Sequence, residues 1–218
     1  HRLRTTAGSH ERFLVIEVFG RYAGYTVMLP TMAGAADRCV IPEYDFDVEL
    51  LCELLSEDRK KSPSNYAVVL ISEGARIAGD AEMSFESEER DQYGHKKLGG
   101  IGDRVAARLK EASPKYNNGN RVNIVNQRLG YLVRCGEPDA IDSIVPMAYG
   151  NLALDLIMAN KTGLLVAINK GTYGSVSLDV LSGEKKDVDV KKYYKTSRLR
   201  PVYGQFEGEP VFIMASRM

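Results

Sequence analysis

Apolar and β-branched residues gather in short runs along the chain, and segments with helical spacing separate these runs. The runs typical of buried strands are Phe13 to Phe19 and Tyr66 to Ser72, and further strands are predicted over Cys39 to Ile41, Arg121 to Gln127 and Leu164 to Ile168. Runs of this length without a polar face indicate strands covered on both sides. Strands that alternate with helices predict an α/β fold with a largely parallel sheet flanked by helices.

The helical segments show identifiable starts and interruptions. We expect helices over residues 21–36, over a stretch with Val48, Leu51, Leu54 and Leu55 on one face, after Gly99-Gly100-Ile101-Gly102, and from Pro138 to about Asn160. Pro30 should kink or divide the first of them. Asp45 or Asp47 can cap the second, because a carboxylate at that position accepts a hydrogen bond from a free backbone N–H.

Two segments give a weaker pattern. Residues 76–98 are polar, with an acidic run followed by a basic one, and they predict the longest loop of the chain. Beyond Gly171 the pattern weakens into short strands and a charged stretch. The pattern alone therefore leaves the organisation of the C-terminal part open.

Composition excludes several classes of protein. The chain has 218 residues, of which 44% are hydrophobic and 27% charged, with a formal net charge of zero. A nucleic-acid-binding surface needs a basic excess, so we expect no nucleic-acid partner. The three cysteines (Cys39, Cys52 and Cys135) form no CxxC pair, and the three histidines are isolated. Neither a disulfide framework nor a zinc site is expected.

No apolar run reaches the length of about 20 residues that spans a bilayer, and we expect no membrane partner. The chain opens with His1 and a basic, polar stretch without the apolar core of a signal peptide. We expect it to be part of a longer polypeptide.

Polar residues at strand ends are the candidates for chemistry. Gly20 and Arg21 follow the first strand, where open α/β sheets bind ligands. An arginine offers a rigid fork of donors that suits phosphate, although a surface arginine at the start of a helix fits the pattern equally well. Glu73 follows a second buried strand, and its carboxylate can accept hydrogen bonds from sugar hydroxyls or can be a plain loop acid.

Three further features complete the set. Arg128, Tyr131 and Arg134 lie within seven residues and can clamp a phosphate, or can face water from an edge strand. Arg12 precedes the strand that leads to Arg21. Glu17 lies inside that apolar strand, and a buried carboxylate needs a partner, for which we expect a neighbouring arginine.

Four motifs occur in a fixed order over about residues 1–170. They are the stretch from Leu3 to Arg12 with Val15 to Gly24, the triplet Ile41-Pro42-Glu43, the segment Ile71-Ser72-Glu73-Gly74, and Leu129 to Pro138 with Asp142. They resemble the SSHxR–VVEVMGRxAG, IPE, ITEG and LGHxQRGGxPxxxD motifs of the phosphofructokinase family. The ordered set is far more specific than any single match.

The resemblance implies two Rossmann-like α/β domains with the active site between them. Residues 1–133 would form the sugar-phosphate domain, 134–170 a segment of the donor-side domain, and 171–218 would return to the sugar side. It implies a cytoplasmic enzyme of glycolysis, a homodimer or homotetramer, that transfers a phosphoryl group from ATP or pyrophosphate to O1 of fructose 6-phosphate. The family's donor loop and its Mg²⁺-binding and catalytic-base carboxylates precede the region matched by residue 1, so the chain alone is expected to be inactive.

The resemblance also implies roles for single residues. Phe19, Gly20 and Arg21 would lie against the sugar, with Arg21 also near the transferred phosphoryl group, and Glu73 would hold fructose hydroxyls. The 6-phosphate would be gripped by Arg134 and Tyr131, and by Arg12 from a neighbouring subunit.

The sequence departs from the family pattern at several positions. Phe19 replaces a methionine, Tyr131 a histidine and Val125 an arginine that contacts the 6-phosphate. These exchanges motivate an alternative, a non-catalytic regulatory subunit that binds a fructose phosphate effector. Arg4 and Glu43 match effector-binding positions of bacterial members, whereas residues 62–64 lack the basic side chains of that site.

Overall fold

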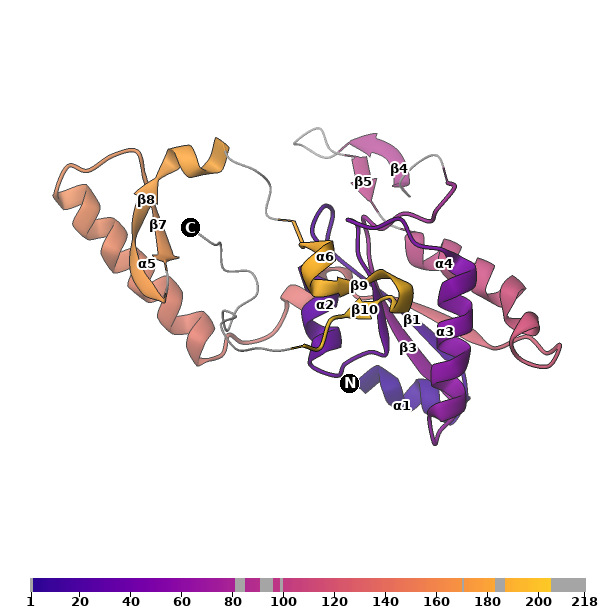
Figure 1. The fold of residues 1–218 in the computed structure, drawn as a ribbon. Coiled ribbons are helices and arrows are strands. Elements are labelled where there is room, and N and C mark those ends of the chain that lie inside the picture. The colour runs from indigo at the N-terminus through magenta and orange to yellow at the C-terminus, as the bar shows by residue number, and fades with distance from the viewer. Residues whose placement is uncertain are drawn as a thin grey trace. The chain divides into compact units, whose positions relative to one another are not determined.

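The computed structural model describes residues 2–80, 85–90, 96–98, 100–169, 171–182 and 187–204. These residues form two compact units (Figure 1). The first unit contains the described residues up to 133 together with 187–204, and the second contains 134–169 and 171–182.

A parallel sheet forms the centre of the first unit. Its strands are β1 (Phe13–Val18), β2 (Arg38–Val40), β3 (Ala67–Ser72) and β6 (Ile124–Arg128), in the spatial order β2-β3-β1-β6. All three pairings are parallel, and every residue of β1 and β3 is buried. The structure confirms the predicted α/β fold, and it places the carboxyl ends of β1 and β3 side by side.

Helices flank this sheet. They are α1 (Arg2–Ser9), α2 (Tyr25–Met32), α3 (Val48–Lys61) and α4 (Ile101–Ala112), with short 3-10 turns at Ser113–Lys115 and Gly130–Arg134. Asp47 caps α3 by accepting a hydrogen bond from the Glu49 N–H at 2.8 Å. The helix α2 is shorter than the predicted 21–36 and contains Pro30. It ends at Met32 because Gly34, just after the Ala33 cap, has a φ of +79°, the left-handed conformation that commonly ends a helix.

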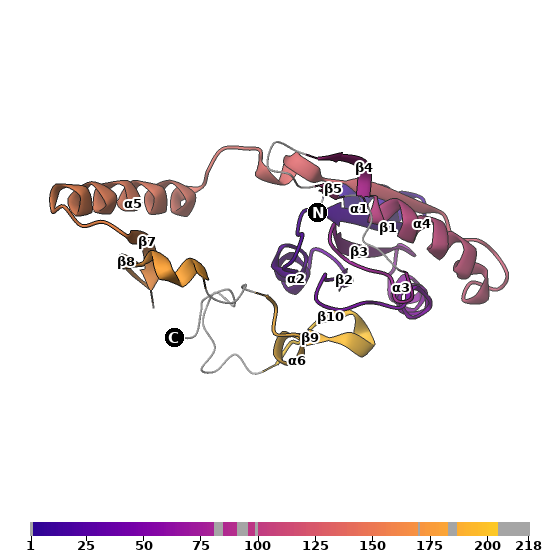
Figure 2. The ribbon, with the colours of Figure 1, turned by 90° about the horizontal axis from the view of Figure 1, so that it is seen from above.

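The segment 187–204 packs against α2 and β2 (Figures 1 and 2). It contains α6 (Val190–Tyr193), β9 (Tyr194–Lys195), a 3-10 turn at Thr196–Arg198 and β10 (Arg200–Pro201). The Tyr194 hydroxyl donates to the Cys39 carbonyl at 2.6 Å, and the Tyr203 hydroxyl donates to the Thr31 carbonyl at 2.9 Å. Chain from beyond residue 186 therefore completes the first unit.

The predicted loop over residues 76–98 is wrong in part. Two short antiparallel strands, β4 (Phe85–Arg90) and β5 (Lys96–Leu98), occur within it. Their residues are mostly charged, so they lack the apolar alternation by which a strand is predicted.

The second unit contains the long helix α5 (Ala140–Met158), the hairpin of β7 (Leu164–Asn169) and β8 (Thr172–Ser177), and a 3-10 turn at Leu178–Ser182. Tyr149 of α5 packs edge-on against Tyr173 of β8, with ring centroids 6.1 Å apart. No residue of α5 is buried. Among the described residues, α5 is the one helix that by length and composition could cross a bilayer. It is not a continuous apolar run, because Asp142, Asn151 and Asp155 lie within it.

The three cysteines should differ in reactivity. Burial raises the pKa of Cys39 to about 12 and that of Cys52 to about 11, whereas Cys135 is exposed. Since the thiolate is the reactive form, we expect one fast-reacting thiol per native chain with an aromatic disulfide reagent near neutral pH, and three after denaturation. Replacing Cys135 with serine should abolish the fast phase. A fast phase that survives this substitution would contradict the assignment.

Candidate functional site

The loop after β1 and the residue after β3 meet at the carboxyl edge of the sheet. Val18 and Ser72 are register partners, so the next residues of both strands leave the sheet together. The Gly20 N–H lies 3.4 Å from Glu73 Oε1, to which it donates. Arg21 follows Gly20 and is half-buried. The structure thus brings the Phe19–Arg21 loop to Glu73, two features that the apolar pattern proposed separately and that the family resemblance placed in one site.

Backbone contacts fix this meeting point. The Gly20 carbonyl accepts hydrogen bonds from Ser72 Oγ at 2.8 Å and from the Gly74 N–H at 3.1 Å. A Cβ added at Gly74 would lie 2.0 Å from the Arg21 carbonyl oxygen. Gly20 itself has a φ of +150°, where a Cβ would meet Ser72 Oγ at 2.3 Å. Both glycines are required by the close approach of the two segments.

Ser72 and Thr26 support the loop, and the sequence analysis did not single out either of them. Ser72 is fully buried, and Thr26 Oγ1 donates to the Phe19 carbonyl at 2.6 Å. Small hydroxyl residues at such positions carry no pattern of their own. The signal that could have found Ser72 is a polar residue at the last position of an otherwise apolar strand.

Glu17 anchors the start of α4. Its carboxylate accepts from the Gly102 N–H at 2.8 Å and from the Gly100 N–H at 3.2 Å, and Arg128 Nε lies 3.8 Å away. The predicted arginine is therefore present, but the nearest partners are backbone amides. A carboxylate at the first turn of a helix satisfies free N–H groups and suits the helix dipole.

Arg128 is engaged within the protein. Its guanidinium pairs with Asp103 at 2.5 Å besides the contact with Glu17. A hydrogen bond from Asn126 holds the pKa of Asp103 below its ordinary value, and Arg128 lowers this pKa further. Through these contacts Arg128, at the end of β6, holds α4 against the sheet.

The other predicted residues lie elsewhere. Arg12 precedes β1, and the six residues of that strand separate it from Gly20 by roughly 20 Å. Arg12 therefore lies at the amino ends of the strands, and Gly20 lies at their carboxyl ends. The Arg12 Nε is buried and has no hydrogen-bond partner in the part of the chain that the structure describes. Tyr131 and Arg134 belong to the 3-10 turn Gly130–Arg134 after β6, and Arg134 is the first residue of the second unit.

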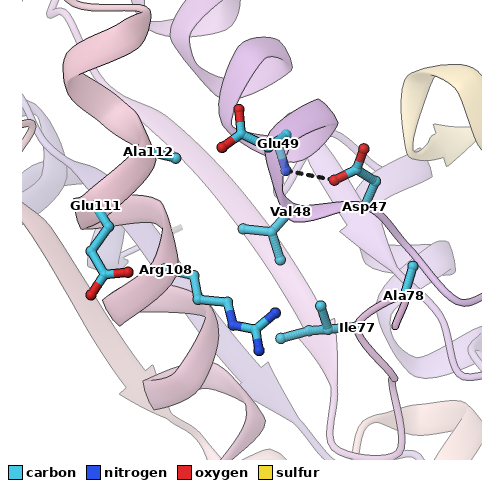
Figure 3. Close-up of a pocket in the computed structure, with 8 residues that line it drawn as sticks. All are labelled: Asp47, Val48, Glu49, Ile77, Ala78, Arg108, Glu111 and Ala112. Carbon is cyan, nitrogen blue, oxygen red and sulfur yellow. Dashed lines mark hydrogen bonds between the residues drawn. The ribbon is translucent and has the colours of Figure 1, made fainter. Parts of the chain in front are cut away.

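A hollow of about 380 Å³ lies between the start of α3 and the end of α4 (Figure 3). Its lining residues are Asp47, Val48, Glu49, Ile77, Ala78, Arg108, Glu111 and Ala112. Its three acids outnumber its one arginine, and Arg108 donates to Asp80 at 2.7 Å. A phosphate would be repelled there, so this hollow does not compete with the Arg21 loop as an anion site.

No group of three or more histidine, cysteine, aspartate or glutamate side chains that could hold a metal ion occurs among the described residues.

Comparison with known proteins agrees with the geometry. A family model described as phosphofructokinase matches residues 1–157. The chain is 34% identical over 194 residues to a pyrophosphate–fructose 6-phosphate 1-phosphotransferase of Dictyoglomus thermophilum, a match covering 88% of the chain and 53% of that protein. It is 31% identical over 192 residues to an ATP-dependent 6-phosphofructokinase of Corynebacterium efficiens, with the same coverages.

Solved structures show the same fold. The chain superposes on a pyrophosphate-dependent phosphofructokinase from Nitrosospira multiformis with a TM-score of 0.70 at 18% identity, covering 92% of this chain and 49% of that one. For the corresponding enzyme from Marinobacter aquaeolei the TM-score is 0.66, also at 18% identity, with coverages of 93% and 48%. The chain spans about half the length of the curated relatives it matches.

Proposed function

Because the chain belongs to the phosphofructokinase family, we propose that it carries the sugar-phosphate side of an enzyme that phosphorylates fructose 6-phosphate. The phosphoryl group comes from ATP or pyrophosphate and is transferred to O1, which gives fructose 1,6-bisphosphate. Relatives named for each donor have similar identity to this chain, so both donors belong in the proposal.

The observation that carries this proposal is the meeting of the Phe19–Arg21 loop with Glu73. The hydrogen bond from Gly20 to Glu73 joins the loop that contains Arg21 to a carboxylate at the carboxyl ends of two parallel strands, where open α/β sheets bind ligands. In this proposal Glu73 binds the sugar and Arg21 binds phosphate. Phosphoryl transfer depends on positioning and charge stabilisation more than on covalent work by the protein. An arginine next to a hydroxyl-binding acid suits these requirements.

Each residue has one task in this proposal. Arg21 stabilises the charge of the transferred phosphoryl group, Glu73 accepts hydrogen bonds from fructose hydroxyls, and Phe19 and Gly20 form the wall against the sugar. Tyr131 and Arg134 hold the 6-phosphate. Arg12 serves the site of a neighbouring subunit in a homodimer or homotetramer, which agrees with its place before β1, at the amino end of the strand and away from the Phe19–Arg21 loop.

We place the donor site, and the Mg²⁺ that would neutralise the donor's phosphates, on polypeptide equivalent to the other half of the relatives. The helix α5 supports this division. Its large apolar residues Ile141, Ile144, Met147, Leu154, Ile157 and Met158 are 52–75% exposed. They project on several sides of the helix, and a helix that is apolar all round is normally buried. A cytoplasmic enzyme of glycolysis fits the reaction.

Complementation tests this proposal directly. Adding the polypeptide that matches the N-terminal half of the relatives, fused or separate, should produce fructose 1,6-bisphosphate with ATP or with pyrophosphate. The chain alone should be inactive and should bind fructose 6-phosphate in a calorimetric titration. No product with either donor, under conditions where the two polypeptides form a complex, would refute the proposed reaction.

The relatives' names favour the enzyme over the regulatory alternative, since the matched proteins are named as phosphotransferases and phosphofructokinases. The titration separates the two ideas as well. A preference for fructose 2,6-bisphosphate over fructose 6-phosphate would favour the regulatory subunit.

A further inference from the structure

The carboxylate of Glu43 joins three segments that are distant in sequence. Glu43 follows β2, and its Oε1 accepts from the Gly24 N–H at 3.0 Å and from the Val188 N–H at 2.8 Å. The two donors lie 19 and 145 residues away. One oxygen atom therefore ties the loop after β1 to the C-terminal segment 187–204.

The Gly24 contact closes the loop that carries Arg21. At one end of this loop, Gly20 is held by Glu73 and Ser72. At the other end, Gly24 begins α2, where its carbonyl accepts from the N–H groups of the first turn, and its own N–H is taken by Glu43. Arg21 lies between these two fixed points, so the reach of its guanidinium depends on both.

The Val188 contact makes the second fixed point depend on the C-terminal segment. Val188 is 4% exposed, and its neighbour Asp187 accepts a hydrogen bond from the Tyr25 hydroxyl at 3.0 Å. The segment thus touches both Glu43 and the first residue of α2. A Cβ at Gly24 would lie 2.3 Å from Ile41, so the loop has no room to move toward β2.

We propose that Glu43 is a positioning residue for Arg21, and that the docked segment 187–204 sets the affinity of the sugar-phosphate site through it. The length of the glutamate side chain carries this role, because its oxygen must reach two amides at once. The proposal rests on the proposed function only because it takes fructose 6-phosphate as the ligand of Arg21. The contacts of Glu43 can be tested without this ligand.

The test compares Glu43→Asp and Glu43→Gln with the wild-type chain by amide hydrogen exchange. Aspartate keeps the charge and is one methylene too short to reach both donors, whereas glutamine keeps the reach and loses the charge. We expect exchange at residues 21–24 and at Val188 to be about tenfold faster in Glu43→Asp and close to wild type in Glu43→Gln. The dissociation constant of fructose 6-phosphate, measured by calorimetry on the same chain, should rise about tenfold in Glu43→Asp and be restored in Glu43→Gln.

Asp37→Asn is the matched control. Asp37 is a half-buried carboxylate just before β2 that also accepts a backbone N–H, from Val68 at 2.8 Å, and it lies away from the loop. This variant should leave exchange at residues 21–24 and the affinity unchanged. Unchanged exchange at Gly24 or Val188 in Glu43→Asp would overturn the proposal, as would a loss in Glu43→Gln equal to that in Glu43→Asp. A wild-type chain that binds no fructose 6-phosphate would refute the proposed function. The hydrogen-exchange result would then still test whether Glu43 holds residues 21–24 and Val188 in place.

Discussion

If the proposed function holds, replacing Arg21 with alanine should lower kcat/KM for fructose 6-phosphate about a thousandfold, measured on this chain fused to or paired with the polypeptide that matches the N-terminal half of the relatives. Arg21 supplies a positive charge in the loop after β1, and Gly20 of this loop donates a hydrogen bond to Glu73 at the carboxyl ends of the strands. In phosphoryl transfer such a charge acts on the transition state, so kcat should fall more than KM rises. Steady-state rates with each donor measure both effects.

Arg21→Lys separates charge from geometry. Lysine keeps one positive charge but lacks the planar fork of donors, so we expect it to recover about a tenth of the lost activity or less. The matched control is Arg76→Ala, which removes an exposed arginine paired with Asp45 in the loop after β3 and should leave the rates unchanged. If Arg21→Ala retained activity within a few fold of wild type, Arg21 would not be the catalytic arginine.

The strand ends were predictable because they depend on local pattern. The apolar runs that become β1 and β3 stop where polar residues begin, so Arg21 and Glu73 could each be placed at a strand end from the sequence. That the two strands are neighbours is a property of the sheet order β2-β3-β1-β6, which the apolar pattern does not encode. The family resemblance supplied the pairing, and the register of Val18 with Ser72 gives its physical basis.

Hydrogen-bond partners from distant chain segments could not be predicted from the sequence. The buried acid Glu17 in β1 predicted an arginine as its partner, but the closer partners are the backbone amides at the start of α4. The contact between Glu43 and Val188 crosses 145 residues and uses a backbone donor, which any residue except proline supplies. Because residue type does not tell which backbone amide is a donor, contacts of this kind can be identified only from the folded structure.

Gly74→Ala should lower kcat/KM about a hundredfold or more while the chain remains folded. A Cβ at this position would lie 2.0 Å from the Arg21 carbonyl oxygen, which is backbone and cannot turn aside as a side chain does. The Arg21 backbone must shift, and a misplacement of about 1 Å at a reacting group costs about a hundredfold in rate. The free energy of unfolding should fall by about 2 kcal/mol from overpacking, as measured by urea denaturation.

Gly204→Ala provides the control for the general effect of adding a methyl group. Gly204 is exposed in the first unit, and a Cβ added there would approach only Val202 Cγ1, at 3.6 Å, which is an ordinary van der Waals contact, so alanine should leave the rates unchanged. The quantity to compare in Gly74→Ala is the loss of kcat/KM relative to the loss of unfolding free energy. Because Arg21 is displaced and not removed, the activity lost should exceed what partial unfolding explains, and binding of fructose 6-phosphate should weaken in proportion. A folded Gly74→Ala chain with unchanged affinity and unchanged rates would mean that the approach of the two strand ends does not position the arginine.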